Sequence, residues 1–169
     1  LVKILTINML NNKTGFAMKS FSSSLPMMLY RALDVVMPRF RTIFREFGLT
    51  EQQWRILRVL WEGDDVSAGE LAEQALIPPQ SLVGIVDKLE KRGLVARRPN
   101  KDDRRGILVR VTANGQKLKE LVTRRVDAAY RELRLSLDPI DWKQLQHGLD
   151  CICKIDAVAD DHAADASKQ

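Results

Sequence analysis

Residues 79–111, PQSLVGIVDKLEKRGLVARRPNKDDRRGILVRV, contain the pattern that decides how this chain folds. The stretch opens with Pro79, which suits the first position of a helix. Gly93 is placed to end that helix in a left-handed conformation. The stretch therefore predicts a helix from Pro79 to about Arg92. Its inward face is formed by apolar residues at helical spacing: Leu82, Ile85, Val86 and Leu89.

A β-hairpin is predicted directly after this helix. The runs Leu94–Arg98 and Ile107–Val111 have β character, and they enclose the polar, basic loop 99–106. A shorter helix, Ala68–Leu76, is predicted just upstream, separated from the first by the turn at 77–78. Two helices joined by so tight a turn are typical of a helix-turn-helix, and an added basic hairpin makes it a winged helix.

The rest of the ordered chain is predicted to be helical, so the fold class is mostly α with a small β-hairpin wing. Thr50 with Gln53, and Ser67 with Glu70, form capping boxes at two helix starts. Pro38 falls inside a long helical pattern and is expected to kink it. The further predicted helices are Leu25–Phe47, Glu51–Glu62, one from the cap Thr112 to about Arg134, and one from Asp138-Pro139 to about Ile155.

The termini show no such periodicity. Residues 1–20 are expected to be an arm, flexible or ordered by a partner chain, and 157–169 a disordered tail. Between them, 21–156 are expected to form one domain. Within it we expect a winged helix at 50–111 and dimerisation helices at 21–48 and 112–156.

The positive charge is concentrated in the predicted winged helix. Residues 77–112 carry nine Lys or Arg against four acidic residues, so this window holds the whole formal charge of +5. A compact basic segment in an otherwise neutral chain is typical of a protein that binds a polyanion. A solvated charged face is the alternative when the charge is considered alone.

Most other functional classes lack support in the sequence. The two cysteines, Cys151 and Cys153, do not form a disulfide framework, and the two histidines lie in no cluster with metal-ligand spacing. No glycine-rich phosphate loop, nucleophile–base pair or carboxylate pair is evident. No apolar run is long enough to span a membrane. We therefore expect a cytoplasmic protein that is not an enzyme and holds neither cofactor nor metal.

A winged helix reads duplex DNA with the second helix of its turn and with its wing. On that helix the outward residues expected to contact DNA are Gln80, Ser81, Val83, Gly84 and Lys88. In the wing, Arg97, Arg98 and Arg104 are expected to contact phosphates, and Arg105 is suited to the minor groove. Asp103 is expected to support the loop through an ion pair with Arg105.

Two segments carry a resemblance to a known family. The stretch 87–95, DKLEKRGLV, and the stretch DRRG at 103–106 running into VRVT at 109–112 resemble the MarR family of bacterial repressors. The resemblance covers about residues 25–156. It implies that Asp103 and Arg105 form the family's Asp-x-Arg wing motif, with the arginine in the minor groove. LTEQQWRIL at 49–57 and PQSLVGI at 79–85 are similar to the subgroup that represses homoprotocatechuate catabolism.

The resemblance also implies an intertwined homodimer on a palindromic operator. The apolar stripes of the first and last long helices agree, because they need a partner to cover them. Effectors in this family bind where the dimerisation helices meet the DNA-binding lobe, and an aromatic acid there needs a flat wall and a cation. The candidate wall is Trp54, the candidate cations are Arg31, Arg41 and Arg55, and the candidate lining residues are Met28 and Phe40.

The predicted function is therefore that of a dimeric repressor released from DNA by a small aromatic acid or phenol. The alternative is a DNA-binding regulator of the same fold that senses redox state or has no effector, such as an architectural protein. Cys151 and Cys153 are two residues apart on a helix and point to different faces, so packing is favoured over redox sensing.

Overall fold

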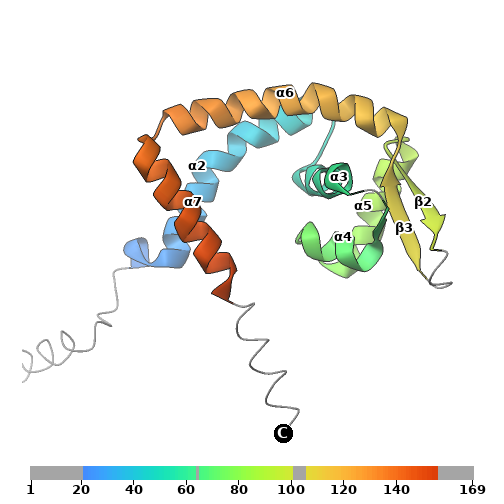
Figure 1. Cartoon of the computed structure of the whole chain (residues 1–169), viewed down its shortest axis with the longest axis horizontal. Coiled ribbons are helices and arrows are strands. Elements are labelled where there is room, and N and C mark those ends of the chain that lie inside the picture. The colour runs from blue at the N-terminus through green and yellow to red at the C-terminus, as the bar shows by residue number, and fades with distance from the viewer. Residues whose placement is uncertain (1–20, 64, 101–105, 156–169) are drawn as a thin grey trace, which may run out of the picture. The chain divides into compact units, whose positions relative to one another are not determined.

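A computed structural model describes residues 21–63, 65–100 and 106–155 of the 169-residue chain. Helices dominate, and a small antiparallel sheet completes the fold (Figure 1). The predicted fold class is confirmed. In chain order the elements are η1 (Phe21–Ser23), α2 (Leu25–Glu46), α3 (Glu51–Glu62), β1 (Val66–Ser67), α4 (Ala68–Gln74), α5 (Pro79–Lys91), β2 (Val95–Pro99), β3 (Ile107–Val111), α6 (Ala113–Leu135) and α7 (Pro139–Cys153).

The chain divides into two compact units, residues 1–42 and residues 43–169. The described part of the first unit consists of η1 and most of α2. The helix continues through Pro38, where the Thr42 hydroxyl donates to the Pro38 carbonyl at 3.0 Å. Several large apolar side chains of this unit are exposed: Leu25, Met28, Tyr30, Leu33 and Val35.

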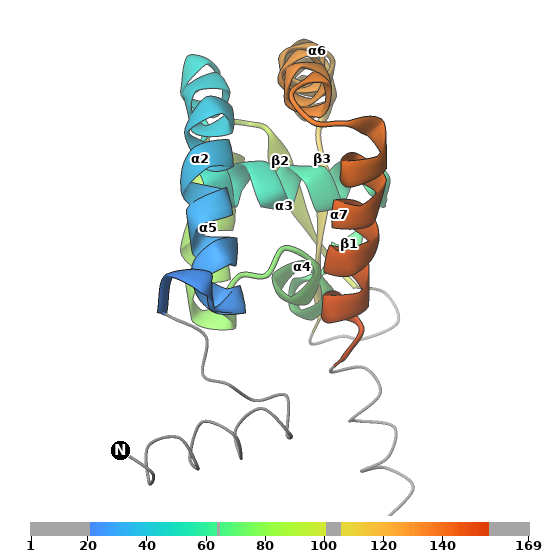
Figure 2. The same cartoon turned by 90° about the vertical axis from the view of Figure 1, so that its left-hand side faces the viewer.

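The second unit contains a lobe in which α3, α4 and α5 pack around the three strands (Figure 2). The strand order is β1-β3-β2, with both neighbouring pairs antiparallel. The core of the lobe consists of fully buried aliphatic side chains: Ile56, Leu57, Leu60, Leu71, Val86, Leu89, Val95 and Val109. The hairpin is confirmed, and β2 shifts by one residue from the predicted bounds.

Strand β1 was not predicted, because a strand of two residues shows no alternation. Val66 pairs with Val109, and Ser67 with Leu108. Ser67 also caps α4: its hydroxyl and its backbone N–H both donate to the Glu70 carboxylate, and the hydroxyl accepts from the Glu70 N–H. These bonds, that of the hydroxyl first, lower the pKa of Glu70. Both predicted capping boxes are present.

The turn between α4 and α5 differs from the prediction. Helix α4 ends at Gln74 instead of Leu76. Leu76 has φ +51°, a left-handed conformation that is uncommon for a residue with a side chain as large as leucine's. The helix therefore stops before Leu76. At the other end of α5 the prediction is confirmed, since Gly93 has φ +66°.

Helix α6 is attached to the lobe by its first turns. The indole Nε1 of Trp61 donates to the Gly115 carbonyl at 3.2 Å, and the Lys119 Nζ donates to the Trp61 carbonyl at 3.1 Å. Helix α7 follows α6 and contains no buried residue. Its large apolar side chains, with that of Ile155 just beyond it, are exposed in this single chain: Ile140, Leu145, Leu149, Ile152 and Ile155.

Candidate nucleic-acid interface and effector site

Helix α5 presents one face to the core and the other to solvent. Leu82, Val86 and Leu89 are buried, whereas Val83 is 61% exposed. Of the other residues predicted to contact DNA, Gln80, Gly84 and Lys88 are exposed and Ser81 is half-buried. The structure thus places all five together on the first three turns of one helix.

The start of α5 is electrostatically suited to a phosphate. Its first turn has no acidic residue, and no side chain caps it. The N-terminal end of a helix carries a partial positive charge, which favours an anion nearby. The space around Gly84 is open, because a Cβ added there would meet nothing within 4 Å. A nucleic-acid backbone could therefore approach this part of α5 closely.

The wing is described only in part. Asp103, Arg104 and Arg105 lie outside the described residues, so their predicted roles stay predictions. Arg98 lies in β2, and its Nη2 is 2.5 Å from the Asp65 Oδ2. The Arg98 side chain is 44% exposed, so half of it remains accessible to a partner.

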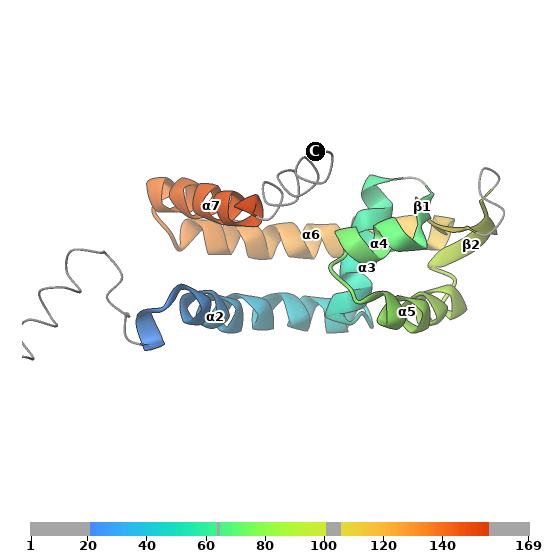
Figure 3. The same ribbon diagram turned by 90° about the horizontal axis from the view of Figure 1, so that it is seen from below.

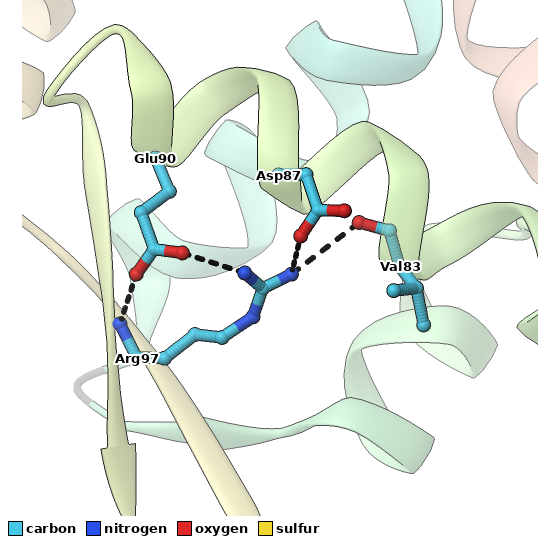
Figure 4. Close-up of polar contacts among 4 residues, drawn as sticks. All are labelled: Val83, Asp87, Glu90 and Arg97. Carbon is cyan, nitrogen blue, oxygen red and sulfur yellow. Dashed lines mark hydrogen bonds and ion pairs between the residues drawn. The ribbon is translucent and has the colours of Figure 1, made fainter.

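Arg97, next to it in β2, has a different environment from the one expected. Its guanidinium donates to Asp87, Glu90 and the Val83 carbonyl, all on α5 (Figure 4). The Arg97 guanidinium is therefore bound to α5 of the same chain, whereas the sequence predicted a contact with a phosphate. The sequence shows two adjacent arginines and carries no signal that distinguishes them.

Trp54, in the first turn of α3, belongs to an aromatic cluster. Its ring stacks on Phe44 with centroids 4.9 Å apart and meets the edge of Trp61 at 5.5 Å. The Arg58 guanidinium carbon lies 6.0 Å from the Trp54 ring centroid. Arg58 also pairs with Glu62, with a distance of 2.6 Å between Nη2 and Oε1. Sequence reasoning missed Arg58, although its spacing of four from Trp54 was an available signal.

Arg55 lies away from this aromatic face. Its Nη1 donates to the Leu76 carbonyl at 3.0 Å, and its Nε is buried with no hydrogen-bond partner among the described residues. Arg55 therefore supports the left-handed turn before α5. This contact favours a structural role over the predicted role as the cation of an effector pocket.

The other predicted effector residues lie on α2, in the unit formed by residues 1–42. Phe40 is buried, whereas Met28, Arg31 and Arg41 are exposed. Their participation in an effector pocket with Trp54 stays a prediction.

Arg92 fixes the C-terminal end of α5. Its Nη1 donates to the Gly48 carbonyl at 2.6 Å and its Nη2 to the Phe47 carbonyl at 3.0 Å. Gly48 has φ +64°, and a Cβ there would meet the Arg92 guanidinium at 3.4 Å. The corner before α3 and the end of α5 are therefore joined through one side chain.

The described ranges contain neither a cluster of metal ligands nor a membrane-spanning helix. Within 21–63, 65–100 and 106–155, no three His, Cys, Asp or Glu side chains are grouped to hold a metal ion. Over the same residues no helix is long and apolar enough to cross a membrane. Cys151 and Cys153 are free and exposed, and the Cys151 Sγ lies 3.7 Å from the His147 Nε2.

Comparison with known sequences identifies related regulators. A profile described as "MarR family" matches residues 47–106. The HTH-type transcriptional regulator FarR of Neisseria gonorrhoeae is 38% identical over 112 residues, which cover 66% of this chain and 77% of FarR. The homoprotocatechuate degradative operon repressor of Escherichia coli is 35% identical over 127 residues, which cover 75% of this chain and 86% of that repressor.

Solved structures of two other proteins are also similar to this chain. NadR in complex with 4-hydroxyphenylacetate is 35% identical with a TM-score of 0.70, and the match covers 83% of this chain and 99% of NadR. CouR of Rhodococcus jostii RHA1, bound to p-coumaroyl-CoA, is 27% identical with a TM-score of 0.70, covering 79% of this chain and 94% of CouR.

Proposed function

This chain belongs to the MarR family of transcriptional regulators, and from that premise we propose that it is a dimeric repressor that binds a palindromic operator and is released by a small aromatic acid or phenol. DNA binding is inferred from the outward face of α5. Gln80, Val83, Gly84 and Lys88 are exposed directly over a buried apolar row. Side chains at the start of such a helix reach base edges in the major groove.

Dimerisation is supported by the apolar residues that a single chain leaves exposed. On α7 Leu145, Leu149 and Ile152 follow one helical stripe, and no residue of α7 is buried. A helix with an uncovered apolar stripe gains stability by burying it against a partner. A two-fold dimer would present two α5 helices to two half-sites, about one helical turn apart.

Trp54 and Arg58 are the residues that we propose to bind the effector. The indole provides a flat apolar wall, and the guanidinium lies over it, paired with an exposed glutamate, Glu62. An aromatic carboxylate could stack on the wall and replace Glu62 as the partner of Arg58. NadR, which is 35% identical, was solved with 4-hydroxyphenylacetate, a molecule of this chemical class.

Changing Arg58 to Gln is expected to weaken the binding of 4-hydroxyphenylacetate at least tenfold, about 1.4 kcal/mol, because the carboxylate loses its charged partner. Quenching of tryptophan fluorescence measures the dissociation constant. Arg55→Gln is the matched control on the same helix. It is expected to keep ligand affinity and to lower DNA affinity, because it releases the Leu76 carbonyl. Equal loss of ligand affinity in both variants would contradict the assignment of Arg58.

Changing Arg105 to Ala is expected to weaken operator binding by about 1–3 kcal/mol, the scale of one good contact. The family resemblance implies that this side chain enters the minor groove. Fluorescence anisotropy with a labelled operator measures the loss, and sedimentation confirms that the dimer is intact. An unchanged operator affinity would remove Arg105 from the interface.

The function as a whole is tested with DNA and ligand together. The wild-type protein first selects its operator from a library of random duplexes. Release is then measured with 3,4-dihydroxyphenylacetate, 4-hydroxyphenylacetate, protocatechuate, hydroxycinnamates and salicylate. Sequence-selective binding that no compound relieves would favour a regulator without an aromatic effector. Release by peroxide that is lost in Cys151→Ser or Cys153→Ser would favour the redox alternative.

A further inference from the structure

Arg97 joins strand β2 to helix α5 through two carboxylates and a backbone carbonyl. Its Nη1 donates to the Glu90 Oε2 at 2.5 Å, and its Nη2 donates to the Asp87 Oδ1 at 2.6 Å and to the Val83 carbonyl at 3.3 Å (Figure 4). The Arg97 backbone N–H adds a bond of 3.0 Å to the Glu90 Oε1. One residue of the wing strand therefore holds two successive turns of the helix.

The three acceptors lie on one face of α5, because residues 83, 87 and 90 are separated by four and three positions. α5 and β2 lie side by side (Figure 3). A guanidinium presents its donors in a rigid planar fork, so bonds from both of its ends define an orientation as well as a distance. Arg97 thus restrains the rotation of α5 relative to the strand at the base of the wing.

The same contacts make Arg97 a poor phosphate ligand. Its side chain is only 26% exposed, against 44% for Arg98, and both Nη atoms already donate to α5. To reach a phosphate, the guanidinium would have to leave Asp87 and Glu90. Both carboxylates would then stand unpaired beside the polyanion.

We infer that Arg97 is a positioning residue for DNA recognition: it sets the angle between α5 and the wing, and it does not contact DNA. This inference rests on the proposed function. It predicts that Arg97 contributes to the distinction between operator and other DNA, whereas a phosphate contact would contribute equally to both.

The test removes the link without changing net charge. In the double variant Asp87→Asn/Arg97→Gln, one negative and one positive charge are lost together. Binding is measured by anisotropy, over a range of salt concentrations, to the operator selected by the wild type and to a scrambled duplex of the same length and composition. We expect operator affinity to fall at least tenfold and scrambled-duplex affinity to stay within twofold, with an unchanged salt slope.

A matched control removes another ion pair of the second unit, also without changing net charge. Glu46→Gln/Arg125→Gln breaks the pair between α2 and α6, whose Nη2–Oε1 distance is 3.1 Å, and should leave both affinities unchanged. Arg97→Lys keeps the positive charge but cannot span the acceptors, so it should also lose operator preference. Thermal melting of each variant without DNA confirms that it is folded.

Three results would overturn the inference. Equal loss of affinity for both duplexes, with a salt slope smaller by about 0.9, would identify Arg97 as a phosphate contact. A double variant that discriminates as well as the wild type would show that the link does not position α5. A wild-type protein that selects no duplex would overturn the proposed function and the inference together, and only this last result is obtained from the wild type alone.

Discussion

Gly115→Ala is expected to destabilise the lobe by about 3 kcal/mol, at the upper end of the usual cost of overpacking a core. A Cβ at this position would lie 2.3 Å from the Leu94 carbonyl oxygen and 2.4 Å from the Val111 Cγ2. The first of these neighbours is backbone and cannot rotate away. The added methyl must therefore push the start of α6 off the sheet.

The same displacement would break two bonds at this junction. The Gly115 N–H donates to the Thr112 hydroxyl that caps α6, and the Gly115 carbonyl accepts from the Trp61 indole at 3.2 Å. Thermal unfolding followed by circular dichroism should show a melting temperature lower by roughly 6–12 °C, from 2–4 °C per kcal/mol at this chain length.

Gly69→Ala is the matched control for this substitution. Gly69 lies in helix α4, and a Cβ there would meet nothing within 4 Å. Alanine loses less backbone entropy than glycine in a helix, so this variant should be more stable by about 0.5–1 kcal/mol. A Gly115→Ala protein as stable as the wild type would show that α6 packs on the sheet less tightly than described.

Leu149→Asp is expected to separate the proposed dimer and to reduce operator affinity at least a hundredfold. Leu149 is 39% exposed in the single chain, on the stripe that also carries Leu145 and Ile152. A carboxylate in a dry apolar interface costs several kcal/mol. By two-fold symmetry the interface would receive two of them, and a monomer would present one α5 where the operator has two half-sites.

Sedimentation velocity measures the oligomeric state, and anisotropy measures operator affinity on the same samples. His147→Asp on the opposite face of α7 introduces the same charge change and should leave the dimer intact. A dimeric Leu149→Asp protein would place the dimer interface elsewhere. A monomer that still binds the operator with wild-type affinity would contradict the two-headed mode of binding.

The elements of this fold could be predicted closely because their signals are local. Helical period, the cap of Thr50 on Gln53, and the cap of Ser67 on Glu70 each involve residues within four positions of one another. The outward face of α5 followed from the same period. Two features that the sequence did not predict also have a local reason. Strand β1 has only two residues, and Leu76 is left-handed although nothing in its side chain favours that conformation.

The partners of the arginines in the candidate sites could not be predicted from the sequence. The sequence predicted that Arg55 binds an effector and that Arg97 contacts a phosphate, and it assigned no role to Arg58 or Arg92. Their partners lie at very different separations: Glu62 is four positions from Arg58, whereas Gly48 is 44 positions from Arg92. Only Arg58 combines an aromatic wall with an exposed carboxylate partner.

The sequence by itself determined the order of the α-helices and of the two hairpin strands, the concentration of positive charge in the winged helix, and the face that α5 turns outward. Tertiary structure decided which arginines remain for ligands and which hold the protein together. The physical reason is the reach of the side chain. A guanidinium on a long flexible stem bonds whichever acceptors the fold brings near it, and for Arg97 these came from α5.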